Sequence, residues 1–311
     1  MIQTYLLFIV GLVLICLGGD RLVDAAVAIA KKLGIPQIVV GATIVSLGTT
    51  LPEILVSSTA AFNGSAAIAA GNAFGSIICN TALIAGLTQT IKPTNDIEVK
   101  PLKWRSIFFF ATLLGLNILG LMTGTVNRFM GIALLALFCV YAFLNIKLSA
   151  SEGQDEEDDK SEDVSVIKQL IILAVCAALL YVGANLLVDN GILIAEALGV
   201  PQRVIAVTFI ALGTSLPELV TSVVSLIKGY SNVGFGNIIG ANILNMLLVI
   251  GIPATVAGIP LEASTVRTDM PVALLVMGIL LIPILIRKKS SRIQGIALLG
   301  VYVAYCVMSF V

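Results

Sequence analysis

Long apolar stretches alternate with short polar breaks along the whole chain. A stretch of about 17 to 25 apolar residues is long enough to cross a bilayer as an α-helix. Ten stretches fit this description: 3–25, 36–61, 67–90, 105–124, 129–147, 166–188, 202–227, 232–257, 270–286 and 293–310. The pattern therefore predicts an all-α membrane protein with ten transmembrane helices.

One hydrophilic segment interrupts this pattern near the middle of the chain. It reads SASEGQDEEDDKSED at residues 149–163, with eight acids in the twelve positions from Glu152 to Asp163. We interpret it as a solvated linker. A weak calcium sensor is the alternative, although the spacing of its acids matches no EF-hand loop. The predicted division is a first half at 1–148, a linker at 149–165 and a second half at 166–311.

The basic residues predict how the helices are oriented. With the N-terminus outside, the inner loops and inner helix ends hold every basic residue except Arg128, Arg203 and Arg267. Positive charge accumulates on the cytoplasmic side of membrane proteins, so this orientation is favoured. The first apolar run has no basic region before it, and we expect a membrane helix there, not a signal peptide. An even number of helices returns the C-terminus to the outside.

Composition narrows the class of protein. Of the 311 residues, 58% are hydrophobic and 12% are charged, and the mean hydropathy is +1.06. Soluble domains contain about 25% charged residues. We expect a multi-pass protein of the cell membrane whose surroundings are lipid. The formal net charge is zero, which gives no reason to expect a nucleic-acid partner. The sequence also points to no obligate protein partner.

The residue types exclude several kinds of site. The chain has no histidine, so histidine metal sites and histidine-dependent catalytic triads are excluded. Its five cysteines lie within apolar runs and form no CxxC pair, so we interpret them as small buried side chains. We therefore expect no bound cofactor.

The chain contains an internal repeat with a shift of 165 residues. LGTTLPE at 47–53 matches LGTSLPE at 212–218, and 11 of the 20 positions in 34–53 are identical in the second copy. GNAFGSIICN at 71–80 likewise matches GNIIGANILN at 236–245. Each half holds five predicted helices, and five is odd, so the second half begins on the opposite side of the membrane. The sequence therefore predicts two inverted five-helix repeats, an arrangement typical of secondary transporters.

The repeated LGT[TS]LPE motif places polar groups inside apolar stretches. Pro52 and Pro217 lack an N–H, so each leaves a carbonyl without a helical partner and interrupts its helix. Glu53 and Glu218 follow these prolines and are the acids that we place deep in a span. Intramembrane carboxylates are rare and are candidates for an ion pathway. The duplication makes a purely structural kink a poor explanation.

The donor set favours a hard cation. Carboxylates, hydroxyls and free carbonyls suit Ca²⁺, Mg²⁺ or Na⁺, and Mg²⁺ prefers to keep its waters. Glu53 and Glu218 would neutralise one Ca²⁺ or two Na⁺. At about 5 Å and an effective dielectric constant near 20, two carboxylates repel by about 3 kcal/mol. An empty site therefore prefers to take up cations or a proton, which favours exchange over one-way release.

Further candidates come from the second repeated motif. Asn80 and Asn245 are predicted to face the ion pathway as ligands, and Ser76 is a further candidate. The residue that matches Ser76 is Ala241, which has no hydroxyl. The glycines at spacing four are interpreted as helix-packing positions: Gly71, Gly75, Gly236 and Gly240.

The two motif pairs resemble the signature repeats of the Ca²⁺/cation antiporter superfamily, most closely those of prokaryotic Na⁺/Ca²⁺ exchangers. The resemblance covers essentially the whole chain. It implies that Glu53 and Glu218 are the central Ca²⁺ ligands, assisted by backbone carbonyls of Thr49 and Thr214. It implies Na⁺ sites beside them at the following residues: Ser46, Thr50, Ser76, Ala211 and Ser215.

The resemblance also implies a mechanism. Several Na⁺, three in the usual exchange, would be traded for one Ca²⁺, so one net charge would move in each cycle. The first and sixth helices would slide against the other eight to alternate access. The chain differs from many sodium exchangers at Asn245, where they carry aspartate, and at Ala241, where they often carry serine.

Other functions remain as alternatives to Na⁺/Ca²⁺ exchange. An H⁺/Ca²⁺ antiporter with the same fold is the nearest. A passive cation channel would use the same oxygens without counter-transport. An intramembrane protease also uses two acids, but these are aspartates in other motifs, and we do not expect an enzyme.

Overall fold

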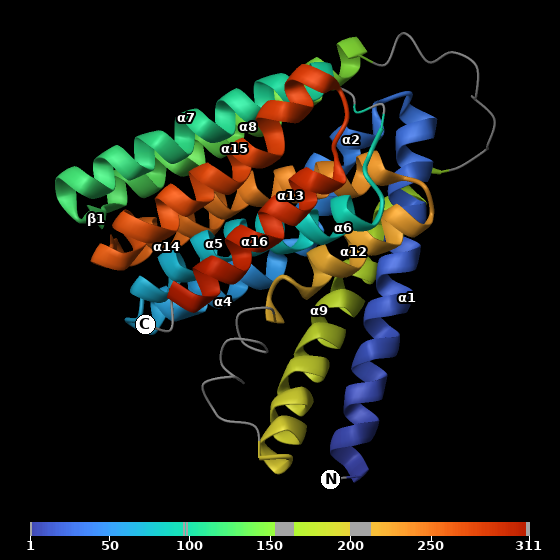
Figure 1. Ribbon diagram of the computed structural model, residues 1–311, viewed down its shortest axis with the longest axis horizontal. Coiled ribbons are helices and arrows are strands. Elements are labelled where there is room, and N and C mark those ends of the chain that lie inside the picture. The colour runs from blue at the N-terminus through green and yellow to red at the C-terminus, as the bar shows by residue number, and fades with distance from the viewer. Residues whose placement is uncertain (1, 96, 98, 153–164, 200–212, 309–311) are drawn as a thin grey trace.

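The computed structural model describes residues 2–95, 97, 99–152, 165–199 and 213–308. Almost all of them are helical (Figure 1). The uninterrupted long helices are α1 (Ile2–Leu33), α7 (Val99–Thr123), α8 (Arg128–Glu152), α9 (Val166–Ala197), α15 (Met270–Arg287) and α16 (Arg292–Met308).

The remaining spans are built from shorter pieces, several of them π-helical turns. The first-half pieces are α2 (Gln37–Val40), η1 (Gly41–Val45), α3 (Ser46–Thr49), α4 (Leu51–Phe62), α5 (Ala67–Ile78), η2 (Cys79–Ala85) and α6 (Gly86–Ile91). The second-half pieces are α12 (Leu216–Ile227), α13 (Ser231–Leu244), η4 (Asn245–Ile250), α14 (Gly251–Ala257) and η5 (Thr265–Asp269). A two-residue antiparallel pair joins β1 (Thr125–Val126) to β2 (Ile259–Pro260).

The chain is a multi-pass integral membrane protein. Within the described residues, seven helices are long and apolar enough to cross a bilayer, and the bent pair 37–49 and 51–62 makes an eighth candidate. Two further helices, α12 and α16, are also apolar but shorter. Each predicted apolar stretch coincides with one of these elements where it is described. Residues 200–212 of the seventh stretch and 153–164 of the predicted linker lie outside the described residues.

The helices form a buried centre and a lipid-exposed periphery. In the span of α13, η4 and α14, 89% of the residues in the most apolar stretch are buried, whereas in α8 the share is 22%. The peripheral helices expose large apolar side chains, among them Leu6, Ile107, Phe143, Ile171 and Ile296. Such surfaces are stable only in an apolar solvent, so these helices face lipid.

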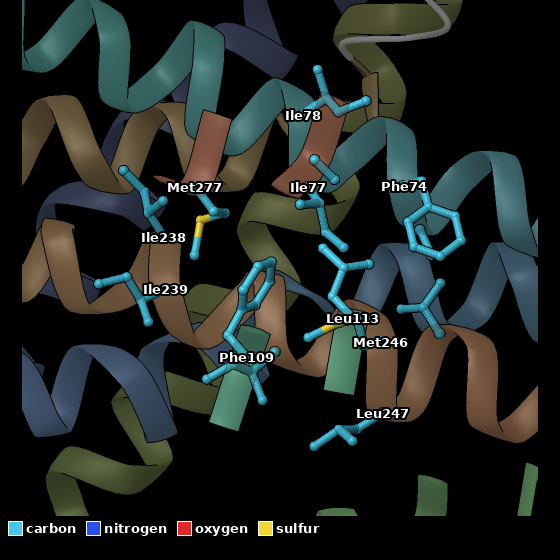
Figure 2. Close-up of a cluster of buried hydrophobic side chains, with 14 of the residues drawn as sticks. Phe74, Ile77, Ile78, Phe109, Leu113, Ile238, Ile239, Met246, Leu247 and Met277 are labelled. Carbon is cyan, nitrogen blue, oxygen red and sulfur yellow. The ribbon is translucent and has the colours of Figure 1, made fainter. Parts of the chain in front are cut away.

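The main hydrophobic core joins the two halves of the chain. Figure 2 shows its centre, where apolar side chains from both halves interdigitate. They come from α5, α7, α13, η4 and α15 and are at most 1% exposed: Phe74, Ile77, Phe109, Leu113, Ile238, Met246 and Met277. Because this core spans both halves, it fixes α5 and α13 against each other at the centre of the molecule.

Helices α1 and α9 pack as a separate pair (Figure 1). A Cβ on Gly11 would lie 2.8 Å from the Gly183 carbonyl oxygen, and a Cβ on Gly18 would lie 3.2 Å from that of Cys176. A later residue of α1 therefore meets an earlier residue of α9, so the two helices run antiparallel. Their apolar faces form most of a second hydrophobic cluster, which includes Ile15, Leu22 and Leu180.

Local structure repeats with the same 165-residue shift as the sequence. Gly34 and Gly199 end corresponding helices with φ of 60° and 75°, and Gly64 and Gly229 do so with φ of 81° and 82°. Only glycine adopts this left-handed conformation without steric cost. The π-helical turns η2 and η4 also occupy matching positions. The halves are thus alike in local structure as well as in sequence.

The packing prediction for the motif glycines is confirmed in the second half. A Cβ on Gly236 would overlap the Ile38 carbonyl, and one on Gly240 would lie 2.5 Å from Ser46 Oγ. Opposite Gly71 and Gly75, no described atom lies within 4 Å of such a Cβ. For these two glycines the packing role stays a prediction.

We expect the substitution Gly236→Ala to destabilise the protein, because the new methyl group would push α13 away from α2. Overpacking of a tight interior typically costs about 1–3 kcal/mol. A thermal unfolding curve in detergent should show a lower midpoint. Gly115→Ala is the matched control, since a Cβ on Gly115 meets no atom within 4 Å. Equal midpoints for the two variants would contradict the packing analysis.

Candidate functional site

The two helix interruptions have the same local geometry. Pro52 and Pro217 lie in the first turns of α4 and α12. The preceding caps are Thr50, with φ −83° and ψ −3°, and Ser215, with φ −88° and ψ 6°. In the first half the chain bends by 43° at this point. The predicted interruptions are therefore confirmed.

Each interruption places a carboxylate in the first turn of a twelve-residue helix. Glu53 and Glu218 are both fully buried. A helix N-terminus carries unpaired N–H groups and a partial positive charge, which favour a carboxylate there. The two glutamates are close enough for their charges to repel each other. The site therefore contains the two predicted acids together.

The glutamate oxygens are largely without hydrogen-bond partners. Neither carboxylate oxygen of Glu53 has a hydrogen-bond partner. In Glu218, Oε2 has none, and Oε1 accepts a 3.4 Å hydrogen bond from the Thr50 hydroxyl. A buried polar group without a partner costs about 1–3 kcal/mol, and a charged one costs more. These oxygens are thus free to hold a cation.

Two asparagines connect each interruption to the opposite half of the chain. The Thr49 hydroxyl donates to Asn237 Oδ1 at 3.1 Å, and the Thr214 hydroxyl donates to Asn72 Oδ1 at 3.5 Å. The two contacts are equivalent, because the 165-residue shift relates Thr49 to Thr214 and Asn72 to Asn237. Each threonine beside a break is therefore held by the other half.

The amide nitrogens of the same asparagines extend the network. Asn237 Nδ2 donates to Thr221 Oγ1 at 2.9 Å. Asn72 Nδ2 donates to Ser57 Oγ at 2.9 Å and to the Glu53 carbonyl oxygen at 3.3 Å. Asn72 and Asn237 were not among the residues predicted from the sequence. The available signal was their identical place, directly after the first glycine of the second motif in both halves.

Asn80 and Asn245 lie at the π-helical turns that follow α5 and α13. Asn80 Nδ2 donates to Asn242 Oδ1 at 3.2 Å, while its own Oδ1 has no partner. Neither polar atom of Asn245 has a partner, although the side chain is fully buried. Both asparagines thus keep an oxygen available inside the protein, as a ligand role requires.

The remaining predicted residues fall into three groups. Ser46 Oγ donates to the Thr43 carbonyl at 3.1 Å and packs against Gly240. Ser76 and Ser215 are buried, and the Ser215 hydroxyl has no partner. Ala211 lies outside the described residues.

The donor types restrict the chemistry of this site. Its ligands would be carboxylate, amide, hydroxyl and carbonyl oxygens. The part of the chain that the structure describes holds no cluster of three or more histidine, cysteine, aspartate or glutamate side chains. Oxygen donors with two carboxylates suit Ca²⁺ and Na⁺. The geometry therefore supports reversible binding of hard cations.

Comparison with known proteins gives a consistent result. The family model described as sodium/calcium exchanger protein matches residues 3–147 and 168–311. The sodium/calcium exchanger MaX1 of Methanosarcina acetivorans is 30% identical over 99% of this chain and 98% of its own length. The inner membrane protein YrbG of Escherichia coli is 31% identical over 100% of this chain and 98% of its own.

The fold also matches a solved structure. The sodium–calcium exchanger NCX_Mj, in crystals soaked with 10 mM Na⁺ and no Ca²⁺, superimposes with a TM-score of 0.84. The sequence identity is 31%, and the match covers 97% of each chain. The likeness therefore extends over both halves of the chain.

We expect Asn237→Leu to weaken calcium binding, because Thr49 and Thr221 both lose a partner. Two hydrogen bonds of about 1 kcal/mol each correspond to an affinity loss of about 30-fold. The half-saturating Ca²⁺ concentration for uptake into proteoliposomes measures this effect. Asn232→Leu on the same helix is the control, since Asn232 Oδ1 has no partner. An unchanged half-saturating concentration in Asn237→Leu would show that the crosswise bonds do not position the site.

Proposed function

The chain belongs to the sodium/calcium exchanger family, and we propose that it exchanges Na⁺ for Ca²⁺ across the cell membrane by alternating access. The observation that carries this proposal is the pair of buried carboxylates with unpartnered oxygens at two matching helix breaks. A bound cation, or a proton, would satisfy them. The protein would be a secondary transporter without a resident cofactor.

The proposed architecture is ten transmembrane helices in two inverted five-helix repeats, with the N-terminus outside. The antiparallel packing of α1 and α9, the first helices of the two halves, supports the inversion. The crosswise hydrogen bonds of Asn72 and Asn237 support it independently, since a two-fold axis exchanges them. The halves would be 1–148 and 166–311, joined by an acidic cytoplasmic linker at 149–165.

The proposed Ca²⁺ ligands are the Glu53 and Glu218 carboxylates and the backbone carbonyls of Thr49 and Thr214. The hydrogen bonds from the threonine hydroxyls to asparagine hold this backbone in place. Asn80 and Asn245 would add amide oxygens. The proposed Na⁺ ligands lie around the same pair: Ser46, Thr50, Ser76, Ala211 and Ser215.

Charge balance explains why the two ions would exclude each other. Two carboxylates neutralise one Ca²⁺ or two Na⁺, so a site loaded with both would hold uncompensated positive charge in a region of low dielectric constant. A third Na⁺ in each cycle would make transport electrogenic, moving one net charge per Ca²⁺. With asparagine instead of a carboxylate at Asn245, neutral oxygens would hold this third ion.

The separate packing of α1 and α9 suggests the moving part. Their shared cluster of apolar side chains is distinct from the main core. A sliding movement of this pair relative to the fixed core would open the site to one side at a time. The close glycine contacts at Gly11 and Gly18 lie inside the pair and would keep α1 and α9 together as they move.

We expect Glu53→Gln and Glu218→Gln each to abolish calcium uptake, because one remaining carboxylate cannot neutralise a divalent ion. Radioactive calcium uptake into Na⁺-loaded proteoliposomes measures this. Glu262→Gln is the matched control, since Glu262 is exposed on a loop. Normal uptake by either core variant would refute the assignment of the central site.

The driving ion is tested with the unmodified protein. We expect calcium uptake when the vesicles contain Na⁺ at equal pH, and none when an acidic interior replaces Na⁺. A potassium diffusion potential that makes the inside positive should speed uptake, because each cycle exports one net positive charge as it imports Ca²⁺. Uptake driven by the pH gradient alone would assign the chain to H⁺/Ca²⁺ exchange.

A further inference from the structure

Beyond the central site, a line of unpaired hydroxyls continues along α12. Ser222 and Ser225 lie about 40° and 20° from Glu218 around the helix axis, and about 6 and 10 Å further along it. They are 3% and 0% exposed, and neither hydroxyl has a hydrogen-bond partner. Ser215, on the other side of Glu218, is unpaired as well. One buried face of α12 thus carries oxygens beyond the central site.

Other buried helical hydroxyls in the same protein behave differently. Thr221, Thr88 and Ser106 each donate to a carbonyl one turn earlier in their own helix, at 2.8, 3.0 and 2.9 Å. This back-bonding is the usual way for a hydroxyl to be satisfied inside an apolar helix. Ser222 and Ser225 depart from it, so an external partner explains them better than packing does.

A small pocket adjoins this face of α12. It is lined by Ser222, Thr88, Gln89, Ser231 and Gly234, among others, and has room for roughly one water molecule. It lies near the turn between α12 and α13, at the end of the molecule that holds Lys92 and Lys228. The proposed orientation makes this end cytoplasmic.

Polar contacts hold the pocket's outer side. Gln89 accepts hydrogen bonds from the Ser290 hydroxyl and from Thr94 N at 3.2 Å. Lys228 Nζ forms ion pairs of 2.7 Å with Asp20 and Asp24 of α1. Gln89 and Thr94 line the pocket, so their hydrogen bonds hold its wall, and the ion pairs of Lys228 attach the nearby end of α12 to α1.

The first half has no equivalent line of free oxygens. Ser57, which matches Ser222, accepts a hydrogen bond from Asn72. Ala60 stands where the second half has Ser225. The feature is thus specific to the path that leads from Glu218 toward the cytoplasmic end.

We propose that Ser222 and Ser225, with the pocket beside Thr88, form a transient site that Na⁺ occupies between the Glu53 and Glu218 pair and the cytoplasm. Neutral hydroxyl oxygens compensate no charge, so the electrostatic cost of burying the ion there is much smaller for monovalent Na⁺ than for divalent Ca²⁺. The site therefore selects for Na⁺. This inference rests on the proposed exchange function and adds a separate step to it.

Chemical access tests the path without depending on transport. Ser225→Cys is placed in a background whose five native cysteines are alanine, and a positively charged methanethiosulfonate reagent is applied to each side of proteoliposomes with Na⁺ present. We expect modification from the cytoplasmic side only. Absence of modification, or modification from the outside only, would overturn the proposal. Ser58→Cys is the control, because Ser58 is about 140° from Glu53 around α4, and it should stay unmodified.

Ion affinities supply the second test. We expect Ser222→Ala combined with Ser225→Ala to raise the half-saturating cytoplasmic Na⁺ concentration about threefold to tenfold. The half-saturating Ca²⁺ concentration, measured by Ca²⁺/Ca²⁺ exchange without Na⁺, should stay the same. Ser58→Ala removes another unpaired hydroxyl and should change neither value.

The outcomes separate this inference from the proposed function. An unchanged Na⁺ concentration, or equal shifts for both ions, would overturn the sodium site even if Na⁺ drives uptake normally. Failure of Na⁺ to drive uptake in the unmodified protein would instead refute the exchange function. The pattern of cysteine access would still report whether the path exists.

Discussion

The rest of the structure depends on one electrostatic constraint, the burial of two carboxylates without a basic partner. No lysine or arginine of the described residues is among the groups that act on Glu53 or Glu218. A permanent ion pair would satisfy the glutamates and remove the need for a transported ion. Instead, the positive ends of two helices and a few hydroxyls stabilise them only in part. In the proposed function, the transported ions supply this missing charge.

Holding such a pair in place requires strong support from neutral groups. The main core fixes α5 and α13 against each other, and tight glycine contacts bring α2 and η1 onto α13. Asn72 and Asn237 then attach each helix break to the opposite half. Neutral hydrogen bonds suit this purpose, because they orient the backbone without supplying the charge that the ion must bring.

The sequence was most informative where one residue type has one physical consequence. Apolar length predicted the spans, Pro52 and Pro217 predicted the breaks, and the carboxylates in apolar stretches predicted the candidate site. The pairing of Thr49 with Asn237 was not predicted, because it joins residues far apart in sequence. The π-helical turns were missed as well, since one extra residue in a helical turn leaves no clear mark in hydrophobic periodicity. Gly236 was identified as a packing position, but its partner Ile38 depends on how the helices cross.

The crosswise bonds of Asn72 and Asn237 have a consequence for how such a protein is made. Each half supplies the group that completes the other half's helix break, so neither half forms a finished site alone. If the halves have the proposed inverted topology, two separate copies would have to insert into the membrane in both directions in equal numbers. Joining them in one chain fixes that ratio at synthesis, and it frees the halves to diverge, as the serines on α12 already have.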